Sequence, residues 1–189
     1  MHWADTASGP MNKINRYDPF KWQPMDIGQI ESPTLLGVLE GWNEIKGKHA
    51  APAWNGTVIE NLPAEIVPYA NVIDVGIGKP PFPYRFFGSG LARMHTFELT
   101  NKTTDEIKPD GFRNLCVDQQ LMVIESCRAM VFLNNIPTHT EGLFRTHVIL
   151  RMPYCTLRNC VTHVLTVEES ERPPEETWNR FRDQHYGSF

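Results

Sequence analysis

Two histidines in this sequence have side chains and positions suited to chemistry. His163 lies in the last predicted strand, on the face expected to point inward, where an imidazole could contact a ligand, act as a base or bind haem iron. His95 follows a glycine-rich turn and could also be an axial haem ligand, since Met94 and Phe97 flank it. Each also has a structural explanation, a hydrogen-bonded core histidine for His163 and an exposed side chain for His95. These residues alone require no cofactor.

Arg85 stands between aromatic residues in the middle of a predicted strand. Its fixed fork of N–H donors could serve as an anion anchor for a carboxylate or a phosphate if the side chain faced a pocket. The alternative, which we favour, is a structural ion pair with Asp74 on the neighbouring strand or with Asp105.

The four cysteines show no paired pattern of the C-x-x-C kind. We expect Cys116, Cys127, Cys155 and Cys160 to be free thiols that pack as small apolar side chains. Cys155, Cys160 and His163 follow a C-x4-C-x2-H spacing, but structural zinc sites usually have tighter pairs and a fourth ligand close by. We therefore predict no metal site.

Composition and charge exclude several classes of function. The chain has a net charge of −4 and no run of Lys or Arg longer than two, so it lacks the basic footprint that holds nucleic-acid phosphates. No segment is apolar enough to span a membrane, and residues 1–20 do not have the basic start and apolar stretch of a secretion signal. We expect a cytoplasmic protein with one folded domain.

The N-terminal part divides into an arm and a helix. Residues 1–32 show no sustained period and are predicted to be a flexible arm. Residues 33–48 are predicted to form an amphipathic helix that begins with Ser32 as N-cap and Pro33 in the first turn. One apolar stripe must be buried against the sheet or against the same helix of a second chain, and we predict a homodimer through Leu35, Leu36, Leu39, Trp42 and Ile45.

The segment 73–107 is the centre of the predicted domain. Two strands, NVIDVGIG and FPYRFFGS, are expected to pair and then to turn through Gly88 and Gly90 into short helices. A long helix is predicted over 111–128, followed by three strands at 129–135, 143–152 and 160–169. In the second of these we expect Val148 and its alternate neighbours to face the core. Residues 170–189 are predicted to be a charged tail with a short helix.

This order of elements predicts an α+β fold, with a five-stranded antiparallel sheet, a long helix across one face and an N-terminal helical extension. It resembles a PAS domain, and in detail the alphaproteobacterial family of single-domain PAS proteins formerly of unknown function. The resemblance depends on the helix with Trp42 and on the segments LPAEIVPYANVIDV, YRFFGSG and LTNKTTDEI. It implies a PAS-like domain at 49–169 that dimerises, binds a small molecule and signals through a separate partner protein. A flavin photosensor would need a reactive cysteine just before the long helix, whereas Cys116 falls inside it.

We predict a ligand pocket between the long helix and the inner face of the sheet. Its expected lining is Tyr84, Phe86, Met94, Leu115, Met122, Val148 and His163. The leading hypothesis is a non-catalytic sensory module. The alternative is a small cone-shaped α+β enzyme, of the isomerase or hydrolase kind, that uses a buried His163 with an acidic partner as base. A third hypothesis is a structural dimerisation domain without a cavity. The sequence does not identify the ligand.

Overall fold

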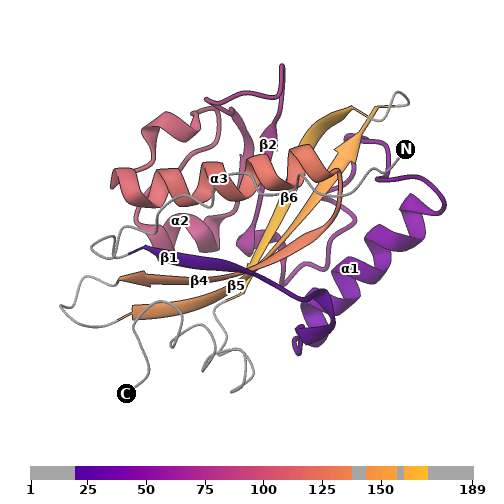
Figure 1. Cartoon of the computed structure of the whole chain (residues 1–189), viewed down its shortest axis with the longest axis horizontal. Coiled ribbons are helices and arrows are strands. Elements are labelled where there is room, and N and C mark those ends of the chain that lie inside the picture. Colours follow the sequence, from indigo (N-terminus) through magenta and orange to yellow (C-terminus); the bar gives the residue numbers. More distant parts are fainter. Residues whose placement is uncertain (1–19, 138–143, 157–159, 170–189) are drawn as a thin grey trace, which may run out of the picture.

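A single sheet of strands, covered by helices on both faces, forms the fold (Figure 1). The computed structural model describes residues 20–137, 144–156 and 160–169. Within them the α-helices are α1 (Pro33–Lys46), α2 (Ser89–His95) and α3 (Asp110–Ser126). The strands are β1 (Lys21–Met25), β2 (Ala70–Asp74), β3 (Tyr84–Phe87), β4 (Met130–Pro137), β5 (Phe144–Cys155) and β6 (Val161–Glu169). Short 3-10 turns occur at Ile27–Gln29, Val67–Tyr69 and Thr104–Glu106.

The sheet is antiparallel, in the order β1-β4-β5-β6-β2-β3. The predicted α+β class is confirmed, as is the order of two strands, short helices, a long helix and three strands. The sheet has six strands instead of the predicted five, because β1 pairs with β4 in the stretch assigned to a flexible arm. Its sequence KWQPM gives no period-2 signal and contains a proline, which a sheet tolerates at an edge. Residues 1–19 and the predicted tail at 170–189 lie outside the described residues.

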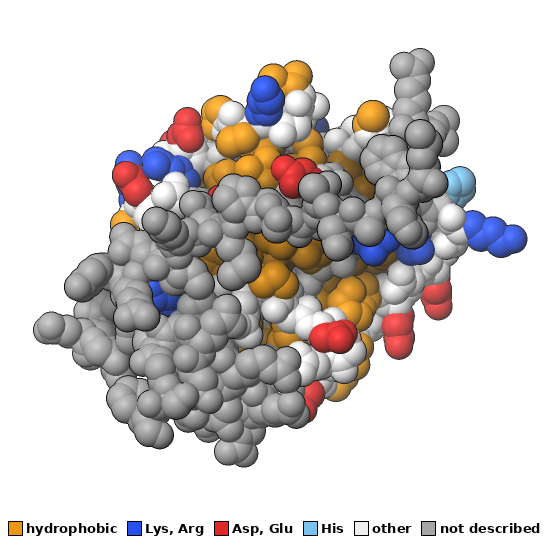
Figure 2. Space-filling view, viewed as in Figure 1, with side chains coloured by type: hydrophobic (Ala, Val, Ile, Leu, Met, Phe, Trp, Pro, Cys, Tyr) orange, Lys and Arg blue, Asp and Glu red, His pale blue; other side chains and the backbone are white. Residues whose placement is uncertain are grey.

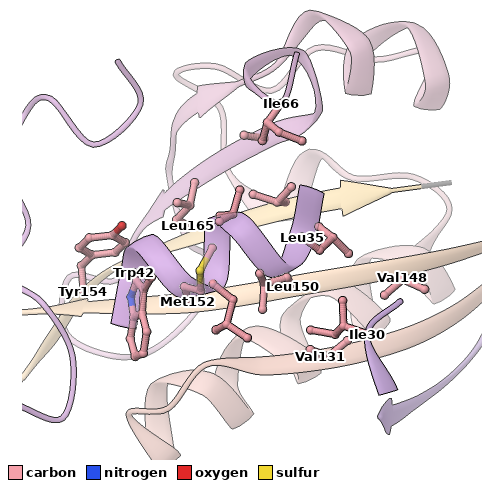
Figure 3. Close-up of a cluster of buried hydrophobic side chains, with 14 of the residues drawn as sticks. Ile30, Leu35, Trp42, Ile66, Val131, Val148, Leu150, Met152, Tyr154 and Leu165 are labelled. Carbon is pink, nitrogen blue, oxygen red and sulfur yellow. The ribbon is translucent and has the colours of Figure 1, made fainter. Parts of the chain in front are cut away.

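Helix α1 forms as predicted and packs on its own sheet. The Ser32 hydroxyl accepts a hydrogen bond from the Leu35 N–H at 3.1 Å, and Gly47 ends the helix with φ 55°. Figure 3 shows Leu35 and Trp42 directed at strand residues from β5 and β6. The Trp42 indole N–H also donates to the Pro153 carbonyl at 3.0 Å.

The predicted dimer interface on α1 is thus mostly occupied within the chain. Leu35, Leu39 and Trp42 are buried in this cluster, and Leu36 is partly buried against it. Only Ile45 is freely accessible, with 62% of its surface exposed. The three buried residues cannot contact a second chain without unpacking α1, so the prediction is wrong for them.

Helices α2 and α3 cover the opposite face of the sheet. In Figure 1 they lie together, away from α1. The side of α3 turned to the sheet buries Phe112, Leu115, Cys116 and Val123, as its three- and four-residue spacing predicted. Two glutamines, Gln119 and Gln120, are buried on the same side. The sheet is therefore buried on both faces, which explains why both alternating sets of β5 and β6 contain apolar residues.

The glycine hinge after β3 is confirmed, and its cause is a close backbone approach. A Cβ on Gly88 would lie 2.3 Å from the Pro68 carbonyl oxygen, and one on Gly90 would lie 2.8 Å from the same atom. The Gly88 N–H donates to the Ala70 carbonyl at 2.8 Å. Strand β2 is shorter than predicted, because the chain turns after Asp74 and leaves Ile77 89% exposed.

Replacing Gly88 with Ala should lower the free energy of unfolding by about 2 kcal/mol, because the new methyl group would overlap the Pro68 carbonyl. Gly37 provides the matched control: it lies within α1, and a Cβ there would meet no atom within 4 Å. Gly37→Ala should stabilise the protein by about 0.5 to 1 kcal/mol through helix propensity. Urea denaturation of both variants measures the difference, and equal midpoints would contradict the proposed close packing at Gly88.

Candidate functional site

Buried polar side chains collect beneath α3 because of the register between β5 and β6. Arg151 stands opposite Thr166, and Ile149 stands opposite Glu168. Side chains two residues apart on a strand share a face, so His147 joins Arg151 on this side. Each of these four polar residues is buried, and together they form a polar patch inside an apolar layer.

The Glu168 carboxylate lies between two imidazoles. The Nδ1 atom of His147 forms a short contact with it, and the Nε2 atom of His95 lies 3.3 Å away. Burial opposes the charged form of Glu168, but the two histidines outweigh this and hold the pKa of its carboxyl group well below the usual range. Because His95 belongs to α2, this cluster ties α2 to β6 and β5.

Arg151 forms a second polar group, in which its side-chain hydrogen bonds go to the neutral residues Gln119 and Thr166. Its Nε and Nη2 atoms donate to the Gln119 side-chain oxygen, each at 3.1 Å, and Nη1 donates to the Thr166 hydroxyl at 2.8 Å. The Gln119 amide nitrogen then donates to the Asn134 side-chain oxygen at 2.6 Å. Arg151 is only 3% exposed, and its guanidinium joins β5 to α3 and β6, while Gln119 extends the group to β4.

A small cavity lies among these groups. It encloses about 20 Å³, enough for about one water molecule. The side-chain oxygen of Asn71 is buried at its wall and accepts no hydrogen bond from the described residues. Burial raises the pKa of the Cys116 thiol to about 11, so this wall residue is protonated at neutral pH. The other lining residues are Tyr84, Phe87, Leu91, His95, Phe97, Leu99, Ile107, Phe112, Ile149, Arg151, Thr166 and Glu168.

Of the predicted pocket residues, only Tyr84 lines this cavity. Leu115 is buried in the same apolar cluster, and Met94 and Met122 pack at its border. Phe86 and Val148 belong to the cluster on the α1 face, so their assignment to a pocket under α3 is wrong. The predicted strand alternation is confirmed, but the alternating set predicted to face α3 faces α1 instead.

His163 also lies outside the cavity. Its ring stacks on Trp54, with 4.1 Å between centroids. Its Nε2 lies 3.3 Å from an Asp74 carboxylate oxygen, and its Nδ1 lies 2.9 Å from the Thr162 hydroxyl. Burial lowers the pKa of His163, against the opposing effect of Asp74. With both ring nitrogens partnered, this histidine fits the structural explanation and not the role of haem ligand or pocket base.

Arg85 forms the ion pair that we favoured from the sequence. Its Nε and Nη2 atoms donate to the two oxygens of Asp74 at 2.7 and 3.0 Å. The Arg85 side chain is 52% exposed, so the pair lies at the surface and does not anchor an anion in a pocket.

His95, expected to be exposed, is instead packed between Phe97 and Phe112, with ring centroids 5.7 and 5.1 Å away. Its Nε2 faces Glu168, and the cavity that it lines is far too small for a porphyrin. The residues present therefore do not fit a haem at this position.

A second cavity lies on the other face of the sheet, between α1 and the connector that follows it. It encloses about 230 Å³ and is lined by Trp42, Met152 and Tyr154 among other residues. Burial raises the pKa of Tyr154 to about 12. The lining described here has no charged side chain, which distinguishes it from the cavity under α3.

Sequence reasoning missed the residues that form the polar site, above all His147, Arg151 and Glu168. A signal was present: the set of β5 and β6 residues excluded from the predicted core face carries polar side chains at alternate positions. Both strands also carry apolar residues on that face, as strands buried on two sides do. Taken together, these features indicate a polar group inside the protein.

Comparisons with known proteins give distant likenesses only. No protein-family model matches the sequence, and no curated protein is significantly similar to it. Among solved structures, a light-oxygen-voltage (LOV) domain studied with a flavin analogue is 13% identical, covering 61% of this chain and 84% of that chain at a TM-score of 0.39. The light-state LOV domain of the photoreceptor Aureochrome1 is 11% identical, covering 62% and 90% at a TM-score of 0.39. A fungal LOV photoreceptor is 11% identical, covering 74% and 95% at 0.41.

Replacing Glu168 with Gln should lower the free energy of unfolding by about 3 kcal/mol, because removing one charge from a buried pair leaves its partners uncompensated. Glu44→Gln, at an exposed position of α1, is the matched control and should change stability little. Urea denaturation at pH 7 measures both variants. A loss at Glu168 no larger than at Glu44 would show that the carboxylate does not organise this site.

Stability should fall as the pH drops below about 6.5, in part because of His163. The pKa of His163 is lower in the folded protein than in the unfolded chain, so the unfolded chain binds the proton first. Its contribution is present above the unfolded pKa and is lost as the pH falls through the folded pKa. His163→Gln should reduce this part of the slope when free energies of unfolding are measured between pH 7.5 and 5.5, and an unchanged slope would contradict the prediction.

Proposed function

We propose that this protein is a non-catalytic sensory module of the PAS type, which binds a small polar molecule in the site beneath α3. The observation that carries the proposal is a buried set of charged and hydrogen-bonding side chains around a small cavity. Buried charges are weak contributors to stability, since replacement by well-packed apolar residues is often neutral or favourable. A group of this kind therefore supports a functional role.

The chemistry of the cavity wall suggests the class of ligand. A guanidinium has five N–H donors, and three of the bonds from Arg151 go to Gln119 and Thr166. The Asn71 side-chain oxygen offers an acceptor without a partner among the described residues. A small molecule that carries both an acceptor oxygen and an N–H or O–H donor would match these two groups. Anything larger than water would require the wall formed by α2 and the segment up to Ile107 to move.

Helix α2 offers a route by which binding could change the surface. His95 connects α2 to Glu168, and the same side chain lines the cavity. A ligand that competes for either group would shift the equilibrium between positions of α2, by as much as its affinity differs between them. We propose that a separate partner protein in the cytoplasm recognises this change. Homodimer formation remains part of the proposal, with a contact surface outside the buried side of α1.

The surface charge supports a protein or small-molecule partner over a nucleic acid. On the face seen in Figure 2, acidic and basic side chains are interspersed over the described surface and do not gather into one basic patch. The net charge is −4. Among the described residues, no helix combines the length and apolar character needed to cross a membrane.

An enzyme that uses a histidine base is the second candidate, and two histidine–carboxylate contacts favour it, His147 with Glu168 and His163 with Asp74. The geometry supports it less well than a sensor. Both nitrogens of His163 have partners, and the cavity beside Glu168 has room for about one water molecule. A general base needs a ring nitrogen within hydrogen-bond reach of a bound substrate.

Native mass spectrometry of the freshly purified full chain tests the proposed site. We expect a retained small molecule in the wild-type protein and its loss in Asn71→Leu, a substitution of similar shape that removes the acceptor oxygen from the cavity wall. Gly41→Leu is the control, because it fills the α1-side cavity at a position with no atom within 4 Å of the new Cβ. That variant should keep the molecule.

Three results would contradict the proposal. Absence of any bound molecule in the wild-type protein argues against a ligand-retaining sensor. Loss in Gly41→Leu with retention in Asn71→Leu would place the ligand on the α1 face. Conversion of the molecule to a product during incubation of the protein would favour the enzyme.

A further inference from the structure

Two cysteines that are distant in the sequence have their sulfur atoms in contact. The Sγ atoms of Cys127 and Cys155 lie 3.1 Å apart, although 28 positions separate the two residues. None of the four cysteines, all within the described residues, forms a disulfide. A disulfide has a sulfur–sulfur distance of about 2.05 Å, so the pair needs to close by only about 1 Å.

The backbone at Cys127 is unusual for a residue with a side chain. Cys127 caps the C-terminus of α3 with φ 50° and ψ 39°, the left-handed conformation that glycine commonly adopts at helix ends. Its N–H donates to the Val123 carbonyl at 2.9 Å. A non-glycine residue in this conformation is uncommon, and here it directs a thiol at the end of β5.

Cys155 is held in place by the end of β5 and by the connector that follows α1. It ends β5 next to a register irregularity, and its N–H donates to the Pro52 carbonyl at 2.9 Å. The residue is 3% exposed and packs in the cluster beneath α1. Burial raises the pKa of the Cys155 thiol well above its usual range, so this sulfur is protonated and shielded at neutral pH.

Cys127 is the member of the pair that solvent can reach. It is partly buried and lines a surface groove of about 560 Å³. Lys46, His49 and Arg128 also line this groove, and no carboxylate is present among its described lining residues. Basic side chains around the groove attract anionic reagents to the thiol.

We propose that Cys127 and Cys155 form a redox-active pair, which closes to a disulfide when a low-molecular-weight disulfide of the glutathione type enters the groove. The Cys127 thiolate attacks one sulfur of that reagent, breaking its S–S bond and releasing one thiolate. Cys155 then gives its proton to solvent, and its sulfur attacks Cys127 and expels the second thiol. Two cysteine thiols are oxidised to one protein disulfide, and one small disulfide is reduced to two thiols.

Oxidised glutathione, added to the folded full chain, is the probe. After incubation, the protein is denatured, alkylated and weighed intact, and a peptide digest locates any cross-link. We expect two of the four thiols to escape alkylation, a linked peptide pair containing Cys127 and Cys155, and full alkylation after treatment with dithiothreitol. The oxidised protein should also have a higher urea midpoint than the reduced protein, because the cross-link restricts the unfolded chain.

Single substitutions separate the two steps. Cys155→Ser should leave a stable glutathione adduct on Cys127, and Cys127→Ser should form neither an adduct nor a cross-link. Cys160→Ser is the matched control, since Cys160 is exposed and lies near the pair, and it should cross-link as the wild-type protein does. Alkylation of all four thiols in the wild-type protein, a cross-link that includes Cys160, or a lasting adduct on wild-type Cys127 would each overturn the proposal, and none of these outcomes depends on a variant that folds.

Discussion

Burial of the sheet on both faces is the constraint on which the rest of the structure depends. Helix α1 covers one face, and α2 with α3 covers the other, so neighbouring residues of β5 and β6 enter different cores. A polar side chain buried in either core must find its hydrogen-bond partners inside the protein. This requirement explains why Arg151 bonds to Gln119 and Thr166, and why Glu168 faces two histidines.

These polar contacts determine how the helices sit on the sheet. Apolar packing alone allows several helix positions, because cores tolerate substitution of one apolar residue by another when volume and pattern are kept. A buried guanidinium or carboxylate restricts the helix position more strongly, since loss of one partner leaves a buried charge without compensation. The contact of His95 with Glu168 therefore holds α2 over β6, and the contact of Gln119 with Arg151 holds α3 over β5. Hydrophobic contacts alone would define these helix positions less strictly. The small cavity lies between these two fixed points.

Most elements could be predicted from sequence because their signals are local. Ser32 and Pro33 mark the start of α1, and Gly88 marks the turn into α2. Strand β1 gave no such signal, since its pairing with β4 joins segments about a hundred residues apart, and a short edge strand with a proline has a weak pattern. The fold class did not depend on this strand.

The candidate site was less predictable for two reasons: the face to which each alternating set of strand residues points, and the long sequence separation of the residues in contact. Alternation divides β5 into two sets but does not say which set faces α3, and a shift of one residue exchanges all of them. The prediction that Val148 and His163 line the pocket depends on that choice, and both residues lie on the other face or at its border. The contact of His95 with Glu168 spans 73 positions and depends on tertiary structure alone.

The polar site and the thiol pair are on different faces of the sheet but share the same two elements. Helix α3 carries Gln119 in its middle and ends at Cys127, while β5 carries Arg151 and ends at Cys155, where a register irregularity after Tyr154 interrupts the alternation of faces. The Arg151–Gln119 contact and the Cys127–Cys155 contact therefore join α3 to β5 at two points along their lengths. A covalent bond at the second point would restrict the movement of α3 relative to β5, and the first point is where the wall of the cavity is anchored. If the proposed disulfide forms, the two places would be coupled to the extent that α3 and β5 move as rigid elements.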